Sequence, residues 1–190
     1  IIVMNQIYIK KQGLSLKGIQ LLKRMASIIN PEFYKKQGMR VSTYGISRII
    51  ELYEETNGDI IVPIGLLGRL EHTLNEQHII YEVSDLRTQS KIKRKISFSG
   101  TLRDEQQVAL AGVIKNPNGV IIAPTGFGKT VLGIAAFAKL KMKTLVIVNR
   151  VAIAEQWNDK IRTFTEIVSI GKLYDKYHEI NQDIDIATIQ

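Results

Sequence analysis

The chain has 190 residues, of which 45% are hydrophobic and 23% are charged, and its formal net charge is +8. This composition is typical of a globular protein with one large or two small domains. The chain contains no cysteine, which excludes disulfide bonds and thiolate metal sites. Its apolar runs are shorter than the roughly 18 residues of a membrane-spanning helix, and its start lacks the pattern of a secretion signal. We therefore expect no membrane partner.

Positive charge is concentrated in the first half of the chain. Residues 1–100 carry 15 Lys and Arg against 9 Asp and Glu, whereas residues 101–190 carry 11 against 9. A basic surface attracts phosphate backbones, but it also serves simply to keep a protein soluble. Charge alone leaves both interpretations open.

Residues 1–86 predict a small α+β domain. The predicted elements, in chain order, are a helix over 14–29, strands over 47–55 and 59–65, a short helix over 65–74 and a strand over 78–85. The first helix follows from apolar residues at helical spacing, and Asn30-Pro31 is expected to end it. Asn57-Gly58 predicts the turn of a hairpin between the two strands.

A polar and strongly basic stretch, residues 87–100, is expected to be a linker. It holds Lys91, Lys93, Arg94 and Lys95 within five positions. A run of this kind is commonly just solvated chain, and it also suits contact with nucleic acid. Both interpretations remain open for this segment.

From residue 101 the pattern changes to alternating helices and apolar strands. The predicted elements are helices over 103–116, 130–140 and 152–164, and strands over 119–123, 144–148, 168–170 and 184–188. Strands that alternate with helices at this spacing favour a parallel sheet with helices packed on it. The predicted fold class is therefore α/β, with a small α+β accessory domain followed by a parallel sheet over residues 101–190.

The stretch APTGFGKT, residues 123–130, predicts a phosphate-binding loop because it follows an apolar strand and opens a helix. Gly126 and Gly128 allow a tight backbone turn whose N–H groups point at phosphate oxygens. Lys129 supplies a positive charge to the β- and γ-phosphates, and the Thr130 hydroxyl suits Mg²⁺. Ala123 replaces the usual first glycine. The expected ligands are ATP and Mg²⁺, and the expected contacts are Pro124, Thr125, Gly126, Phe127, Gly128, Lys129 and Thr130, with Lys129 and Thr130 also in catalytic roles.

Three further stretches resemble motifs of the superfamily 2 helicases, whose motor domains have a RecA-like fold. LRDEQQVAL (102–110) is similar to the motif in which a glutamine contacts adenine, which implies Gln106, together with Arg103, as nucleotide contacts. TLVIVNRVAIAEQW (144–157) resembles motif Ia and implies that Arg150 contacts the tracked strand. DIDIATIQ (183–190) resembles a later motif and implies nucleic-acid contacts at Thr188 and Gln190.

The first domain resembles the accessory domain of UvsW-type and xeroderma pigmentosum group B-type helicases. The resemblance spans about residues 15–82 and rests on NPEFYKKQGMRVSTYGISRII followed by VPIGLLGRL. It implies binding of duplex or branched DNA. The implied contacts are the phosphate-binding residues Lys35, Lys36, Arg40 and Arg48, and the base-stacking residue Tyr44.

The resemblance also implies that ATP hydrolysis requires parts of the motor beyond the phosphate-binding loop. In this family hydrolysis requires an Asp-Glu motif and a second motor domain, and neither follows Thr130 within this sequence. We therefore expect the first part of an ATP-dependent, cytoplasmic helicase of bacterial or phage type, which needs the remaining motor domains for turnover. Two alternatives stay open: a DNA-binding module with a vestigial loop, and a stand-alone P-loop ATPase or kinase.

Overall fold

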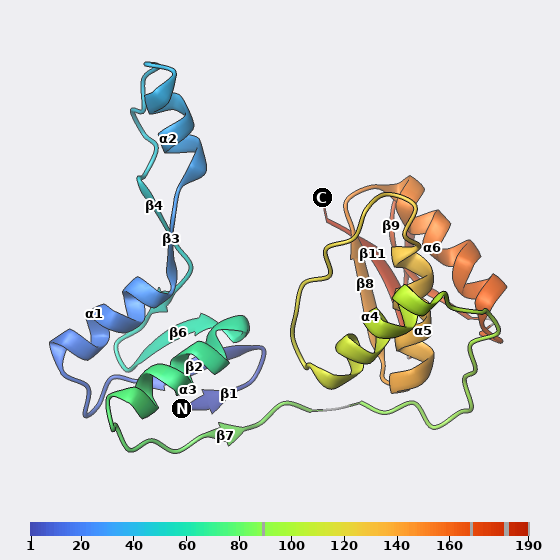
Figure 1. Cartoon of the computed structure of the whole chain (residues 1–190), viewed down its shortest axis with the longest axis horizontal. Coiled ribbons are helices and arrows are strands. Elements are labelled where there is room, and N and C mark those ends of the chain that lie inside the picture. Colours follow the sequence, from blue (N-terminus) through green and yellow to red (C-terminus); the bar gives the residue numbers. More distant parts are fainter. Residues whose placement is uncertain (89, 168, 181–182, 190) are drawn as a thin grey trace. The chain divides into compact units, whose positions relative to one another are not determined.

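The chain forms two compact units, Ile1–Thr88 and Gln89–Gln190 (Figure 1). The structure, a computed structural model, describes residues 1–88, 90–167, 169–180 and 183–189. None of the helices in these ranges is long and apolar enough to cross a membrane. Each unit has its own hydrophobic core, so each is described by itself.

The first unit is built on a five-stranded sheet with the order β5-β6-β2-β1-β7. Its strands are β1 (Ile2–Val3), β2 (Gln6–Lys10), β5 (Glu54–Glu55), β6 (Asp59–Pro63) and β7 (Ser84–Asp85). Helices α1 (Leu16–Met25) and α3 (Leu67–Glu76) supply Leu22 and Leu70 to its core, and the one-turn helix η1 (Ile64–Leu66) precedes α3. The predicted hairpin at Asn57-Gly58 forms, since β5 pairs antiparallel with β6. The strand predicted over 47–55 is not continuous, because only its last two residues belong to β5, and the strand predicted over 78–85 is reduced to β7.

An arm extends from this unit. Strands β3 (Ser27–Ile29) and β4 (Ile49–Glu51) pair as a two-stranded ribbon, and helix α2 (Pro31–Gly38) lies beyond its end (Figure 1). Asn30 caps α2 by accepting a hydrogen bond from the Glu32 backbone N–H at 3.0 Å, and Pro31 occupies the first turn. Asn30-Pro31 therefore starts a helix, because this pair suits a helix N-terminus, and the first helix ends earlier, at Met25.

The second unit contains a four-stranded sheet with the order β10-β9-β11-β8. Its strands are β8 (Thr144–Val148), β9 (Gly171–Tyr174), β10 (Tyr177–Glu179) and β11 (Ile184–Thr188), and its helices are α4 (Asp104–Lys115), α5 (Lys129–Leu140) and α6 (Val151–Phe164). Strand β11 is parallel to both β8 and β9. These findings confirm the predicted α/β class with a partial parallel sheet.

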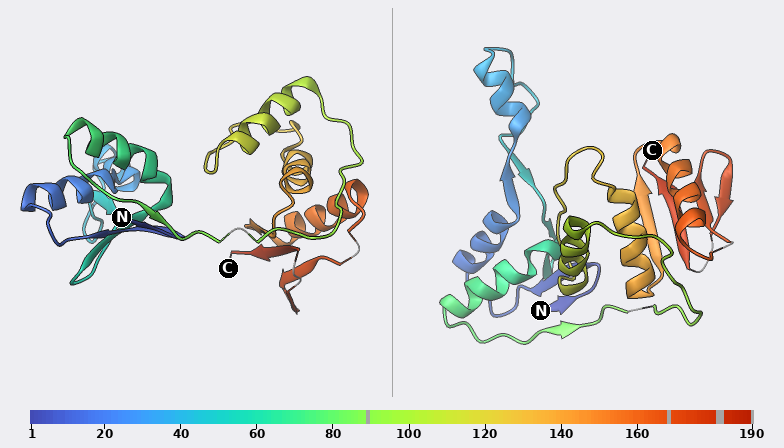
Figure 2. Two further views of the ribbon diagram at one scale, coloured as in Figure 1. Left: turned by 90° about the horizontal axis from the view of Figure 1, so that it is seen from below. Right: turned by 45° about the vertical axis from the view of Figure 1, so that its right-hand side comes forward.

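One face of this sheet is covered and the other is open. Ile134 and Phe137 of α5, Ala154 and Ile161 of α6, and Ile184 and Ile186 of β11 form one buried cluster. Helices α5 and α6 lie on the same side of the sheet (Figure 2). On the other face, Leu145, Ile147 and Leu173 are 56%, 55% and 42% exposed. The core of the unit therefore lies on the side of the sheet that carries α5 and α6.

The strand expected over 119–123 does not form, and this part of the prediction was wrong. These residues have no strand assignment, and Val120 and Ile122 are 88% and 95% exposed. A strand requires a neighbour for its backbone N–H and C=O groups, and no described strand pairs with this segment. The strand expected over 168–170 begins later, at Gly171, and Val168 lies outside the described residues.

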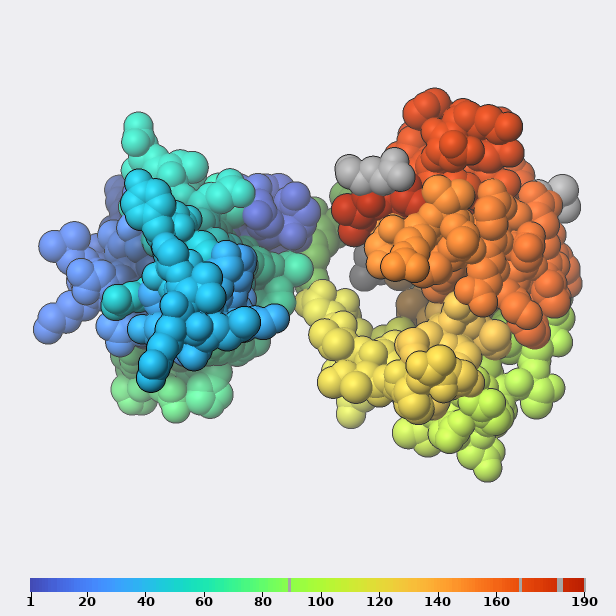
Figure 3. Space-filling model, turned by 90° about the horizontal axis from the view of Figure 1, so that it is seen from above, coloured from blue at the N-terminus to red at the C-terminus, as the bar shows by residue number. Residues whose placement is uncertain are grey.

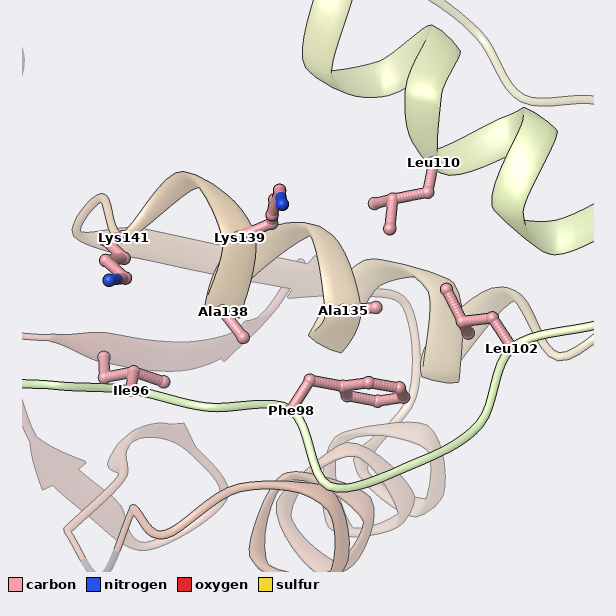
Figure 4. A pocket seen from close by; sticks show the side chains of 8 residues that line it. All are labelled: Ile96, Phe98, Leu102, Leu110, Ala135, Ala138, Lys139 and Lys141. Atoms are coloured by element: carbon pink, nitrogen blue, oxygen red, sulfur yellow. The ribbon is translucent and has the colours of Figure 1, made fainter.

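The segment expected to be a linker packs on the second unit in its later part. Ile92 and Ile96 are 8% and 4% exposed and belong to the core of that unit. Figure 4 shows Ile96 and Phe98 facing Ala135 and Ala138 of α5 across a hollow. Residues 90–99 are therefore named the strap, because their apolar side chains fasten them to the unit while their basic side chains stay exposed.

Candidate functional site: the loop before helix α5

Two glycines give the loop before α5 its shape. Gly126 and Gly128 have φ angles of +82° and +87°, in the left-handed region that side chains rarely adopt. Nothing lies within 4 Å of the position that a Cβ on Gly126 would take. Gly128 is the residue immediately before α5, so the turn leads directly into the positive end of the helix. This geometry suits an anion at residues 124–130, which fits the phosphates of a nucleotide.

The side chain of Lys129 folds back over the loop. Its Nζ donates hydrogen bonds to the backbone carbonyls of Ala123 and Pro124, both at 2.9 Å. Because both acceptors are neutral, the ammonium is held over the loop without a counter-ion from these groups. A phosphate would offer stronger, charge-assisted hydrogen bonds, so the arrangement fits an anionic ligand.

The start of α4 is hydrogen-bonded to the loop. The Gln106 amide nitrogen donates to the Phe127 carbonyl at 2.7 Å, and an Arg103 guanidinium nitrogen donates to the same oxygen at 2.8 Å. Gln106 Oε1 also accepts from the backbone N–H of Arg103 at 3.0 Å, and the Gln106 side chain is nearly buried. The structure thus brings together the loop and both residues that the sequence placed near the nucleotide.

Gln106 also explains why residue 128 is glycine. A Cβ on Gly128 would lie 2.7 Å from the Gln106 amide nitrogen, closer than non-bonded atoms approach. That amide is held by its bond to Phe127, so it has little freedom to move aside. Both the backbone conformation and the packing therefore exclude a side chain at this position.

The carboxyl ends of two neighbouring strands carry the next predicted contacts. Arg150 follows β8 and is the residue before α6, and Thr188 ends β11 opposite Val148. The two strands are parallel, so Arg150 and Thr188 lie at the same edge of the sheet. Gln190, the third predicted contact, lies outside the described residues. Their contact with nucleic acid stays a prediction.

The contacts predicted in the first unit gather on the arm. Lys35 and Lys36 lie on α2, and the others follow in the loop that returns to β4: Arg40, Tyr44 and Arg48. Tyr44 is 97% exposed, which leaves its ring free to stack. Lys36 pairs with Glu32 at 3.0 Å, and the Arg48 guanidinium lies 5.4 Å from the centre of the Phe33 ring. The arm therefore presents a basic end.

The expected metal role rests on Thr130 alone. Within the described ranges no three His, Cys, Asp or Glu side chains come together as a metal site. A magnesium ion there would need oxygen ligands from the nucleotide and from carboxylates. Thr130, as the second residue of α5, is placed to add one hydroxyl to such a set.

Sequence reasoning missed two features of this site. The bond from Arg103 to Phe127 links positions 24 residues apart, and no local pattern predicts it. Residues 119–123 have no strand assignment, and whether they pair depends on which strands lie beside them. They belong to the yellow segment at the surface of the second unit in Figure 3. The glycine and lysine pattern of the loop was recognisable from the sequence, and the helicase-like motif at 102–110 indicated Gln106 and Arg103 as nucleotide contacts.

Comparisons with known proteins show what the chain is similar to in sequence and in fold. Residues 99–190 match the family model described as type III restriction enzyme, res subunit. A DNA 3'-5' helicase XPB of Mycobacterium tuberculosis is 34% identical over 91 residues, which cover 47% of this chain and 16% of that protein. A DNA 3'-5' translocase XPB2 of Sulfurisphaera tokodaii is 33% identical over 75 residues, which cover 40% of this chain and 16% of that protein. The chain thus matches about a sixth of the length of these relatives.

The fold has a counterpart among solved structures. The UvsW helicase from Bacteriophage T4 superposes with a TM-score of 0.58 over 92% of this chain and 69% of that chain, at 14% sequence identity. At this identity the likeness concerns the fold alone. It extends over both units, whereas the family model covers the second.

Proposed function

We propose, on the premise that residues 99–190 belong to the superfamily 2 helicases, that this chain binds ATP at the loop before α5 and nucleic acid at the carboxyl edge of the sheet and on the arm. The observation that carries the proposal is the loop itself. Two left-handed glycines, the start of α5 and the Lys129 ammonium converge on one small region.

In this proposal each residue has a separate task. The backbone N–H groups of residues 126–130 and the Lys129 ammonium hold the phosphates. Gln106 already presents its amide beside the loop, where it would contact adenine, and Thr130 would add a hydroxyl to Mg²⁺. Bound ATP supplies the free energy of phosphoryl transfer. Hydrolysis additionally needs a carboxylate that orients water and cations that stabilise the leaving phosphate, so we expect negligible turnover by these 190 residues alone.

Nucleic-acid binding is supported by charge and position. The arm between residues 30 and 48 carries four Lys and Arg against one Glu, and Tyr44 is exposed beyond α2. Arg150 and Thr188 lie together at the carboxyl edge. The printed names of the relatives refer to DNA helicases and translocases, and we propose DNA as the partner here.

The test is calorimetric titration of the chain with Mg²⁺ and a non-hydrolysable ATP analogue. Lys129→Ala removes the charge that the phosphates require, and we expect affinity to fall by about 100-fold, which corresponds to about 2.7 kcal/mol. Lys176→Ala, in the turn between β9 and β10, removes the same charge elsewhere and should leave affinity unchanged. Equal affinity of the Lys129→Ala variant and the unaltered chain would refute the ATP site. Unchanged binding to DNA by the same variant is expected in either case.

A further inference from the structure

Lysines gather at the edge of the second sheet that lies opposite the loop. The strands β8 and β11 are parallel and begin side by side at Thr144 and Ile184. Helix α5 runs back from the loop to Leu140 and is followed by the short connection that enters β8 at Thr144 (Figure 1). Lys139, Lys141 and Lys143 lie at the end of α5 and in this connection, and therefore at the amino edge of the sheet.

The strap brings three more lysines to the same edge. Ile92 donates a backbone hydrogen bond to the Lys141 carbonyl at 2.8 Å, and the Lys143 backbone donates to the Ser90 carbonyl at 2.9 Å. Lys91 consequently lies opposite Met142 in an antiparallel bridge. Further along, Arg94 forms an ion pair with Asp183, just before β11. The strap thus crosses the amino edge from β8 towards β11.

The resulting set is named the amino-edge lysine surface. Its members share exposure to solvent and come from two segments that are about 50 positions apart in the sequence: Lys91, Lys93, Lys95, Lys139, Lys141 and Lys143. Within the ranges that the structure describes, none of the six has an ion pair. Asp183, whose carboxylate lies beside the strap, forms its ion pair with Arg94. The positive charge of the six lysines is therefore not neutralised by these contacts.

Packing does not require this concentration of charge. The strap is fastened by Ile92 and Ile96, which are buried, and by the hydrogen bond from the Ser99 backbone to the Phe164 carbonyl at 2.9 Å. Like charges on neighbouring exposed side chains repel one another. A polyanion that lies across the edge would relieve this repulsion and release counter-ions.

The side chains at this edge favour the backbone of a duplex over unpaired bases. Lysines are flexible point charges that contact phosphates without reading sequence. Proteins that hold single strands add aromatic side chains on which bases stack. The strap and residues 139–143 contain one aromatic residue, Phe98. Its ring lines the hollow that Lys139 and Lys141 also line (Figure 4), but it packs against the core and stacks on the Phe164 ring at 5.6 Å between ring centres, so it is already engaged within the protein.

We propose that the amino-edge lysine surface binds the phosphate backbone of duplex nucleic acid, as a second contact distinct from the carboxyl edge that carries Arg150 and Thr188. The inference rests on the proposed function for the presence of nucleic acid. It goes beyond that function by placing a duplex on the side of the motor sheet away from the ATP loop.

The test compares two double variants with the same loss of charge. Lys139→Gln with Lys143→Gln removes two members of the surface, whereas Lys10→Gln with Lys17→Gln removes two exposed lysines of the first unit, one at the end of β2 and one on α1. Each variant of the full chain is titrated with a fluorescent blunt duplex and with a single strand of equal length, over a series of salt concentrations. Binding of the ATP analogue and circular dichroism report that both variants fold.

The surface variant should bind the duplex about tenfold more weakly, and its plot of log affinity against log salt should be flatter by about 1.8, because each lost phosphate contact contributes about 0.9. The control variant should match the unaltered chain. Equal duplex affinity and salt slope of the two double variants would overturn the inference. A loss confined to the single strand, or a loss of binding to anionic lipid vesicles with duplex binding intact, would overturn it too. Failure of the unaltered chain to bind any nucleic acid would instead refute that part of the proposed function.

Discussion

Two apolar segments of the second unit, residues 119–123 and strand β8, have the same length and similar composition but different structures. β8 pairs with β11 along its whole length, from Thr144 opposite Ile184 to Val148 opposite Thr188. Residues 119–123 pair with no described strand, and Ile122 is almost fully exposed. Apolar β-branched residues favour a strand, but the strand forms only where a neighbour satisfies its backbone groups.

The loop after the unpaired segment keeps its shape nevertheless. Gly126 and Gly128 remain left-handed and α5 begins directly after them, because the loop is held from the side of α4 by Gln106 and Arg103. The shape of the loop therefore depends on its own glycines and on its hydrogen bonds to α4, and it does not require residues 119–123 to form a strand.

The largest expected effect is a loss of stability, and it tests whether a paired strand and residues 119–123 really differ in packing. Ile186 of β11 is fully buried, so Ile186→Ala should lower the free energy of unfolding by about 2–5 kcal/mol. Ile122→Ala, at an almost fully exposed position, should change it by less than about 0.5 kcal/mol. Denaturant unfolding followed by the fluorescence of Trp157 measures both. A large loss for Ile122→Ala would mean that residues 119–123 are packed in solution.

The next effect tests whether the loop is held by its own conformation and by α4. Gly128→Ala forces a side chain into the left-handed region, which costs about 1–2 kcal/mol, and displaces the Gln106 amide. We expect lower stability together with weaker binding of the ATP analogue. Gly112→Ala, in α4 with nothing within 4 Å of the added Cβ, should raise stability by about 0.5–1 kcal/mol. The idea fails if Gly128→Ala binds the analogue as tightly as Gly112→Ala.

The smallest expected effect is a pH dependence of stability that comes from β5, a polar strand that forms although residues 119–123, which are apolar, do not. β5 (Glu54–Glu55) is exposed, yet it pairs with β6, and Glu55 contacts Lys11 at 2.8 Å and Lys23 at 2.5 Å. Hydrogen bonds from these lysines lower the pKa of Glu55 to about 2 from 4.5. This contribution to stability is therefore present above pH 4.5 and is lost as the pH falls towards 2.

Because the ion pairs of Glu55 with Lys11 and Lys23 are exposed to solvent, the loss of stability in acid should be small. Acid titration of stability, monitored by circular dichroism, should show a weaker decline between pH 4.5 and 2 for Glu55→Gln than for the unaltered chain. Identical pH profiles would show that the two lysines do not stabilise β5. In that event the pairing with β6 would rest on backbone hydrogen bonds and the turn alone.

Much of the second unit was predictable because its elements have strong local signals. β8 and β11 have the predicted bounds, 144–148 and 184–188, and α5 differs from its prediction by one residue at its start. These segments are apolar or periodic over their whole length, so sequence alone indicates them. The loop was recognisable for a similar reason, since its glycines require a special backbone conformation.

The remaining features depend on contacts between distant residues. The path of the strap follows from Ile92 and Ile96 entering a core built by other elements, and its basic composition suggested only a linker. Asn30-Pro31 carried the signal of a helix start but equally that of a helix end. The roles of Lys129, Thr130 and Gln106 towards a nucleotide stay predictions, although the structure places all three at the loop.

Amide hydrogen exchange with and without the ATP analogue and Mg²⁺ tests the central claim most directly, since it reads the backbone groups that are proposed to hold the phosphates. The account predicts that amides of residues 126–130 exchange more slowly when the analogue is bound. In the same experiment, amides of 120–122 should exchange fast without ligand, and the paired amides of β8 should stay protected throughout. Unchanged exchange at residues 126–130 at saturating analogue would contradict the account.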